Sequence, residues 1–246
     1  MDKMFWLDEE TTGTDHTKHA IIQIGGIIEI DGKDEDEFEI LMAPYEGAEI
    51  SQEALDKNGR TREEIMAFPD MGKGISKLKR ILGKYVGKYD RNDKFIVGGY
   101  NVGFDTDFLR RAFALAGDPY YGSWFFSCNL DVMTEVAKQV RGGRRYGDHK
   151  LETVCPAHDI GFGEKGAHDA LADIRATREL YRKLTADSDS FIIRGSSGGY
   201  FIRVIESGNV EWSSDRDDAT VMSADVAISM MTRLYELGFQ SDLAFA

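Results

Sequence analysis

Short apolar runs separated by polar stretches open the chain, and their pattern predicts three strands. Residues 3–8 hold the run Met-Phe-Trp-Leu between charged residues, and residues 20–30 are rich in isoleucine, which favours extended structure. Asp31-Gly32 is a dipeptide typical of a hairpin turn, and residues 36–42 supply the returning strand. The first 42 residues are therefore predicted to form an antiparallel meander.

Helical patterns dominate the following part of the chain and alternate with one further buried strand. Five segments are predicted to be helical, namely 51–66 with an interruption near Asn58-Gly59, 72–88, 105–116, 131–140 and 168–184. Phe95, Ile96 and Val97 form a short apolar strand among them. Strands first, then alternating helices and strands, predict an α/β fold in which helices cover a mixed sheet.

The pattern changes after residue 186, where a polar stretch interrupts the apolar periodicity. The elements predicted beyond it are two strands, at 198–206 and 209–213, and a helix that Ser223 caps. A ββα unit of about 60 residues is marginally stable by itself. We therefore predict a main domain at 1–186 and a small C-terminal unit at 187–246, which docks on the main domain or on a partner.

The composition fits a globular protein with a real core. The chain has 246 residues, 42% of them apolar, which suits one large domain with or without a small appendage. No apolar run approaches the ~20 residues that cross a bilayer, and the N-terminal residues lack the layout of a signal peptide. Cys128 and Cys155 lie far apart and outside any metal-ligand spacing, which predicts reduced thiols in a cytoplasmic protein without membrane contact.

Charge is distributed unevenly along this acidic chain. The net charge of −13 argues against tight non-specific binding to nucleic acid. Residues 1–50 contain 14 acidic and 3 basic side chains, whereas residues 57–94 contain 11 basic and 5 acidic ones. This basic strip is interpreted either as a solvated helix face or as a local guide for a polyanion.

Three acidic residues, Asp8, Glu9 and Glu10, follow the first apolar run directly. Successive side chains of a strand point to opposite faces, so Asp8 and Glu10 are predicted to share one face while Glu9 points away. Two carboxylates held together suit a hard divalent cation such as Mg²⁺. By itself the same pattern is also typical of a solvated acidic turn.

Two further polar groups lie where helices are predicted to begin. Asp105 follows a buried strand, and the helix dipole there favours an ionised carboxylate or a simple cap. His168 and Asp173 are five residues apart and would not share one face of a regular helix. His168 is therefore predicted in the entry loop, with Asp169 as the helix cap. From that loop a neutral imidazole can take a proton from water.

Taken in order, the segments LDEETTG, NVGFD and HDALAD resemble the motifs of the DEDDh family of 3′–5′ exonucleases, in the ribonuclease H-like superfamily. The resemblance covers residues 4–184. Its middle and late segments look most like bacterial exonuclease I, with a more general likeness to proofreading subunits of bacterial replicative polymerases. It implies a five-stranded mixed sheet flanked by helices, and the ββα unit predicted from the residue pattern lies beyond the region of resemblance. It also implies an acidic metal-binding set and a histidine general base, at Asp8, Glu10, Asp105, Asp173 and His168.

By this resemblance the chain is expected to be a 3′–5′ exodeoxyribonuclease that uses two Mg²⁺ ions, with Mn²⁺ as the alternative. It is expected to act on single-stranded DNA or frayed 3′ ends and to release nucleoside 5′-monophosphates. Asp8 is expected to bridge the ions, Glu10 and Asp173 to complete one site, and Asp105 to support the second. The candidate substrate-binding residues are Thr11, Thr12 and Gly13 near the terminal 3′-hydroxyl, with Asn101 and Phe104 from the second motif.

Alternatives remain open at this point. The motifs are shared with exoribonucleases of the same family, so RNA ends are an alternative substrate. A second alternative is a proofreading or recruited subunit, in which residues 187–246 bind a protein partner that supplies grip on DNA. The aromatic residues Trp124 and Phe125 are predicted either to stack on bases or to pack in the core.

Overall fold

The structure is a computed structural model with two compact units, Met1–Tyr181 and Arg182–Ala246. It describes residues 2–163, 166–186, 190–195, 198–204, 210–220, 222–236 and 240–245. The division falls within helix α7 (Ala170–Ala186), five residues before the domain boundary predicted at 186. No helix among the described residues is long and apolar enough to cross a membrane.

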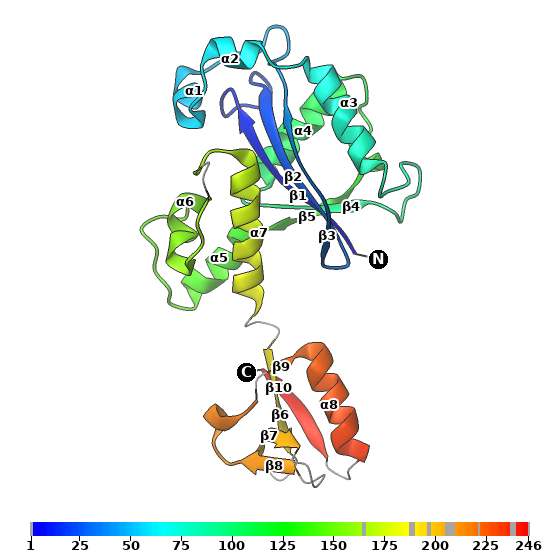
Figure 1. Cartoon of the computed structure of the whole chain (residues 1–246), viewed down its shortest axis with the longest axis vertical. Coiled ribbons are helices and arrows are strands. Elements are labelled where there is room, and N and C mark those ends of the chain that lie inside the picture. The colour runs from blue at the N-terminus through cyan, green and yellow to red at the C-terminus, as the bar shows by residue number, and fades with distance from the viewer. Residues whose placement is uncertain are drawn as a thin grey trace. The chain divides into compact units, whose positions relative to one another are not determined.

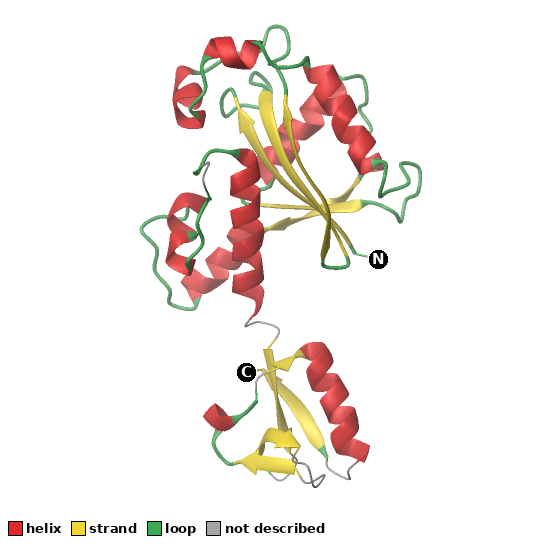
Figure 2. Ribbon diagram, viewed as in Figure 1, coloured by secondary structure: helices red, strands yellow, loops and turns green. Residues whose placement is uncertain are grey.

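A five-stranded mixed sheet forms the centre of the first unit (Figures 1 and 2). In spatial order its strands are β3 (Lys33–Leu41), β2 (Ile21–Ile30), β1 (Lys3–Thr11), β4 (Phe95–Gly99) and β5 (Phe125–Asp131). The first three strands pair antiparallel, as the predicted meander requires, and β4 and β5 run parallel to β1. The expected ribonuclease H-like sheet is therefore confirmed.

Helices cover both faces of this sheet (Figure 1). They are α1 (Gln52–Asn58), α2 (Arg62–Met66), α3 (Met71–Leu82), α4 (Gly103–Leu115), α5 (Val132–Arg141), α6 (Leu151–Val154) and α7, with short 3₁₀ turns at Tyr121–Ser123 and Pro156–His158. The predicted interruption of the first helix is present, because Gly59 adopts a left-handed conformation (φ 63°) that ends α1. The large core lies between the sheet and the pair α3 and α4.

Side chains of β1 alternate between the two faces, and this alternation sets the direction of the acids at its end. Phe5 and Leu7 belong to the core under α3 and α4. Trp6 points to the opposite face, where its ring lies 5.4 Å from that of Tyr181 on α7. Pairing of β1 with β2 stays regular through Glu10, so Asp8 and Glu10 face α7.

The start of α7 lies directly on β2. A Cβ at Gly25 would come within 2.3 Å of the carbonyl oxygen of Ala170, so only glycine permits this approach. Next to it, Gln23 donates a hydrogen bond of 2.9 Å to Oδ2 of Asp169. Asp169 also accepts the N–H of Ala172 at 3.1 Å, which confirms it as the predicted cap. These contacts bring the amino end of α7 beside the carboxyl end of β1.

The second unit is a small sheet with one helix. Its elements are β6 (Ser190–Gly195), β7 (Tyr200–Val204), β8 (Val210–Ser213), a 3₁₀ turn (Arg216–Asp218), β9 (Met222–Ser223), α8 (Ala224–Glu236) and β10 (Ser241–Phe245). The strand order is β10-β6-β7-β8, with β9 also paired to β6. The predicted ββα elements are present as β7, β8 and α8, and the structure adds three strands. The connection at 205–209 and linker residues 187–189 lie outside the described residues.

Candidate active site

A cavity of about 530 Å³ opens where the carboxyl end of β1 meets the amino ends of α4 and α7. Helices α1 and α6 supply its outer walls. Of the residues predicted from the sequence, those that line it are Asp8, Glu10, Thr11, Gly13, Asn101, Phe104, Asp105, His168 and Asp173. Residues from three distant motifs therefore converge on one site.

The carboxylates of this cavity are crowded enough to hold protons. Burial raises the pKa of Asp8 well above its usual range, and the charges of Asp105 and Asp173 raise it further. Burial, with the charge of Asp173, raises the pKa of Glu10 to about 7. Burial also raises the pKa of Asp173 to about 6. Without a bound cation, these carboxyl groups are therefore partly protonated near neutral pH.

Asp105 joins the cluster from the first turn of α4. Its side chain is only 4% exposed, and its Oδ1 accepts the backbone N–H of Glu9 at 3.0 Å. Burial raises the pKa of Asp105 in spite of the hydrogen bonds that its carboxylate accepts. The carboxylate is thus fixed against the strand that carries the first motif.

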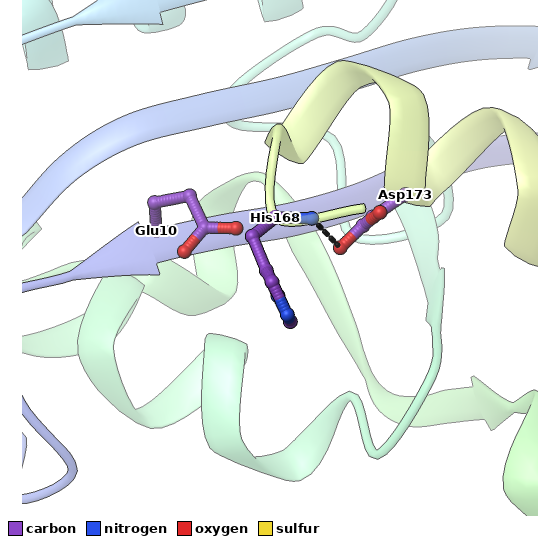
Figure 3. Close-up of side chains that lie close together, drawn as sticks. All are labelled: Glu10, His168 and Asp173. Atoms are coloured by element: carbon purple, nitrogen blue, oxygen red, sulfur yellow. Dashed lines mark hydrogen bonds between the residues drawn. The ribbon is translucent and has the colours of Figure 1, made fainter. Parts of the chain in front are cut away.

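His168 lies in the loop before α7, as predicted, and adopts a left-handed conformation (φ 71°). Its backbone N–H donates to Oδ2 of Asp173 at 3.2 Å, and Figure 3 shows this bond beside Glu10. Its ring atom Nε2 lies 3.2 Å from Oε2 of Glu152. Burial, with the charge of Lys57, lowers the pKa of His168, so the neutral imidazole predominates near pH 7.

This donor set fits a divalent cation. Glu10, His168 and Asp173 each offer a ligand atom, and these atoms lie within 4.8 Å of one another. Within the described part of the chain, Oδ1 of Asp173 is buried and has no hydrogen-bond partner. A buried oxygen without a partner is costly, and a bound cation would satisfy it. Carboxylate oxygens are the ligands that hard cations prefer.

The candidate substrate-binding residues fall into different surroundings. Phe104 is half-buried on α4, with its ring 4.8 Å from that of Phe108, and it lines the cavity. Asn101 also lines the cavity and is held in a left-handed turn (φ 57°). Trp124 and Phe125 are only 5% and 1% exposed. Of the two predicted alternatives, the structure therefore shows packing in the core.

The Thr-Thr-Gly segment at the end of β1 is held mainly by hydrogen bonds to other parts of the fold. Thr12 is fully buried, and its backbone N–H and C=O pair with Ala20 and Ser51. Its groups are therefore used within the fold, contrary to the direct substrate contact expected from the sequence. Thr11 lines the cavity, and its hydroxyl donates to the carbonyl of Gly13 at 2.7 Å.

Comparison with known families matches residues 5–181 to the family described as Exonuclease. The chain belongs to this exonuclease family. The matched region contains all three motifs of the resemblance, and the DEDDh assignment made from them is confirmed.

Curated relatives of this exonuclease carry the name ribonuclease T. The protein from Marinobacter nauticus is 29% identical over 184 residues, which cover 71% of this chain and 78% of the relative. The protein from Haemophilus influenzae is 27% identical over 188 residues, which cover 71% of this chain and 76% of the relative. Each alignment therefore spans most of this chain and most of the relative.

Solved structures of exonuclease I share the fold. E. coli exonuclease I in complex with a dT13 oligonucleotide matches with a TM-score of 0.61 at 18% identity, over 86% of this chain and 51% of that one. Exonuclease I from Methylocaldum szegediense matches with a TM-score of 0.57 at 20% identity, over 91% and 51%. The present exonuclease thus spans about half the length of these structures.

Further side chains that line the exonuclease's cavity were not predicted from the sequence, among them Lys57, Glu152 and His19. Lys57 on α1 and Glu152 on α6 line its outer walls. The ring of His19 lies where a Cβ at Gly13 would be, 2.3 Å from its Cδ2. The local sequence around these residues carries no motif, and only tertiary packing brings them to the site. The one available signal was the basic charge of the segment that begins at Lys57.

The basic strip at 57–94 is divided between two surroundings. Lys79 and Lys88 both form ion pairs with Asp118, at 3.3 and 2.8 Å. Lys57 instead lines the cavity beside the acidic cluster. Part of the strip is therefore ion-paired, and its first residue lines the cavity.

Proposed function

We propose that this exonuclease hydrolyses the terminal phosphodiester bond at 3′ ends of single-stranded DNA and releases nucleoside 5′-monophosphates. The observation that carries the proposal is the convergence of four carboxylates and one neutral histidine on a single cavity. These groups come from β1, α4, α7 and the loop before α7. A cavity of about 530 Å³ is in the range of small-molecule sites and suits one terminal nucleotide.

The four carboxylates would hold two divalent cations. Asp8 would bridge them, Glu10 and Asp173 would complete one site, and Asp105 would support the second. Mg²⁺ is the proposed ion, with Mn²⁺ as the alternative, because both prefer oxygen ligands. When bound, the cations supply the positive charge that stabilises the attacking and leaving oxygens in phosphodiester hydrolysis.

His168 would act as the general base. Its lowered pKa keeps the imidazole neutral, so one ring nitrogen can accept a proton from water. The water oxygen then forms a bond to phosphorus, and the bond from phosphorus to the 3′ oxygen of the preceding nucleotide breaks. The terminal nucleotide leaves with its 5′-phosphate, and the released 3′ oxygen takes a proton from solvent, so the shortened strand ends in a 3′-hydroxyl.

The substrate end would be received by the loop after β1 and by α4. Phe104 presents a partly exposed ring to the cavity, and base stacking on such a ring is tolerant of sequence. Gly13 and Thr11 would approach the 3′-terminal sugar, and Asn101, which also lines the cavity, would contact the same end of the substrate. Single-stranded ends suit this arrangement, because a base that is paired in a duplex would first have to unpair before it could stack on Phe104.

One observation supports DNA as the substrate, and another supports RNA. The exonuclease I structures that share the fold contain DNA oligonucleotides, which supports single-stranded DNA or frayed 3′ ends. The relatives named ribonuclease T support the second candidate, a 3′–5′ exoribonuclease. A panel of 5′-labelled single-stranded DNA, duplex DNA with a mismatched 3′ end, and RNA of the same sequence decides between them. Strong preference for RNA would contradict the first candidate.

The C-terminal unit is the proposed docking element for a protein partner. It has its own small core, formed by Ile193, Phe201, Ala227 and Leu234. The chain as a whole is acidic, with a net charge of −13, so a partner could supply the grip on DNA that such a charge disfavours. In that arrangement the first unit would carry the chemistry and the second would carry recruitment.

A further inference from the structure

The backbone of His168 is fixed, but this does not fix its ring. The left-handed conformation (φ 71°) is uncommon for a residue with a side chain, and the bond from its N–H to Asp173 helps to hold it there. These contacts place the Cα and Cβ atoms. Rotation about the two side-chain bonds remains, and a general base must present one particular nitrogen to water.

Glu152 supplies the missing contact. Its Oε2 lies 3.2 Å from Nε2 of His168. Among the described residues, no other side chain forms an ion pair or hydrogen bond with a ring nitrogen of His168. The carboxylate approaches from α6, a wall of the cavity that contributes none of the proposed metal ligands. The contact is therefore available to orient the ring without drawing on the acidic cluster.

The position of Glu152 is itself constrained. The short helix α6 is anchored by Val154, which is fully buried, and by the adjacent buried Cys155. The other carboxylate oxygen of Glu152, Oε1, lies 3.5 Å from Nζ of Lys150. Glu152 thus contacts this lysine through one carboxylate oxygen and the imidazole through the other.

We propose that Glu152 is a positioning residue for His168, and this inference rests on the function proposed above. Its carboxylate is an acceptor only, so the contact requires a proton on Nε2 of the ring. A neutral imidazole with its proton on Nε2 has its lone pair on Nδ1. Nδ1 is then the atom that takes the proton from the attacking water. The imidazolium formed in this step is paired with Glu152 until its proton passes to solvent.

Kinetics of three variants test the assignment. With Mg²⁺ and a 5′-labelled single-stranded DNA oligonucleotide, Glu152→Ala should lower kcat about tenfold or more and leave KM nearly unchanged. Glu152→Gln keeps an oxygen that accepts the same hydrogen bond, so it should retain most of kcat. Glu135→Ala is the control, because it removes the same charge from neighbouring α5, where Glu135 pairs with Lys138. An unchanged kcat in Glu152→Ala would overturn the proposal.

The tautomer of His168 gives an independent reading in the metal-free protein. Nitrogen-15 NMR of labelled imidazole side chains should show His168 protonated on Nε2 in the wild type, with a tautomer shift in Glu152→Ala. A wild-type ring protonated on Nδ1, or identical spectra in both proteins, would overturn the proposal. The proposed function fails separately, if His168→Ala itself keeps wild-type turnover.

Discussion

The backbone N–H of Glu9 donates a hydrogen bond of 3.0 Å to Oδ1 of Asp105. The pairing of β4 with β1 runs from Met4 to Trp6, and beyond this point the carboxylate of Asp105 on α4 takes the place of a strand neighbour. This bond joins the first and second motifs through the main chain. The side chain of Glu9 is not part of the link.

The three adjacent acids are therefore predicted to differ in function. The Glu9 side chain is 6% exposed, and within the described residues neither of its carboxylate oxygens has a hydrogen-bond partner. Glu9→Gln keeps the backbone bond to Asp105 and should leave turnover close to wild type. Glu10→Gln removes a proposed ligand that faces α7 and should lower kcat more than about 100-fold, above the range for outer-shell partners of metal ligands.

Steady-state hydrolysis of a labelled single-stranded oligonucleotide in saturating Mg²⁺ measures both variants. They have the same net charge and are one residue apart, so each serves as the control for the other. Equal losses of activity would show that strand alternation does not decide which acids serve the site.

Metal affinity should rise steeply with pH. Glu10 and Asp173, with pKa values raised to about 7 and about 6, hold protons that a cation must displace. Mg²⁺ or Mn²⁺ should therefore bind more tightly at pH 8 than at pH 5.5, and titration calorimetry measures the difference. Affinity that is independent of pH across this range would contradict the crowded cluster.

The metal-free protein should show the opposite trend in stability. A carboxyl group whose pKa is raised by folding binds its proton more tightly in the native state than in the unfolded state. The contribution of these groups to the free energy of unfolding is thus fully present below the unfolded pKa. It is lost as pH rises through the folded pKa values, toward pH 7. Urea denaturation with chelator at pH 5 and pH 8 checks the sign, and Glu10→Gln should flatten the slope.

Gly25 should be intolerant of a side chain. A methyl group there would meet the backbone of Ala170 at 2.3 Å and push α7 away from β2. Gly25→Ala is expected to cost about 1–3 kcal/mol of stability, as other overpacked sites do. It should also lower kcat, because α7 carries Asp173. Gly122→Ala is the control, since among the described residues nothing lies within 4 Å of its Cβ position.

Removal of residues 187–246 should leave the chemistry in place. The cut falls after α7, so the contact between Tyr181 and Trp6 is kept. Hydrolysis of a short single-stranded oligonucleotide should stay near wild type, while binding of a protein partner should be lost. Equal losses of hydrolysis and binding would instead indicate that the C-terminal unit supports the main domain.

Much of the first unit could be predicted because its elements carry strong local patterns. The strands β1 and β2 are continuous apolar runs, and α3, α4 and α7 show regular apolar spacing. Strand β5 was missed because residues 127–129 in its centre are exposed and interrupt the apolar run. The short helix α6 and the two-residue strand β9 have too few residues for a period to emerge.

Residues of the candidate site likewise differ in how far the sequence could predict them. The five candidates from the motifs could be proposed from the sequence because each motif is contiguous, and the fold brings all five to one cavity; they are Asp8, Glu10, Asp105, His168 and Asp173. Lys57 and Glu152 belong to α1 and α6, whose approach to the cavity depends on packing distant in sequence. Thr12 was expected to contact substrate, but its burial follows from hydrogen bonds with residues up to 39 positions away.

The most direct test of the account compares purified wild-type protein with Asp8→Asn and His168→Ala on 5′-labelled single-stranded DNA in Mg²⁺. Wild-type protein should shorten the strand from its 3′ end and release nucleoside 5′-monophosphates. Both variants should remain folded, as circular dichroism will show, and lose at least about 100-fold in turnover, the scale of general-base catalysis. Wild-type turnover in either variant would contradict the proposed site.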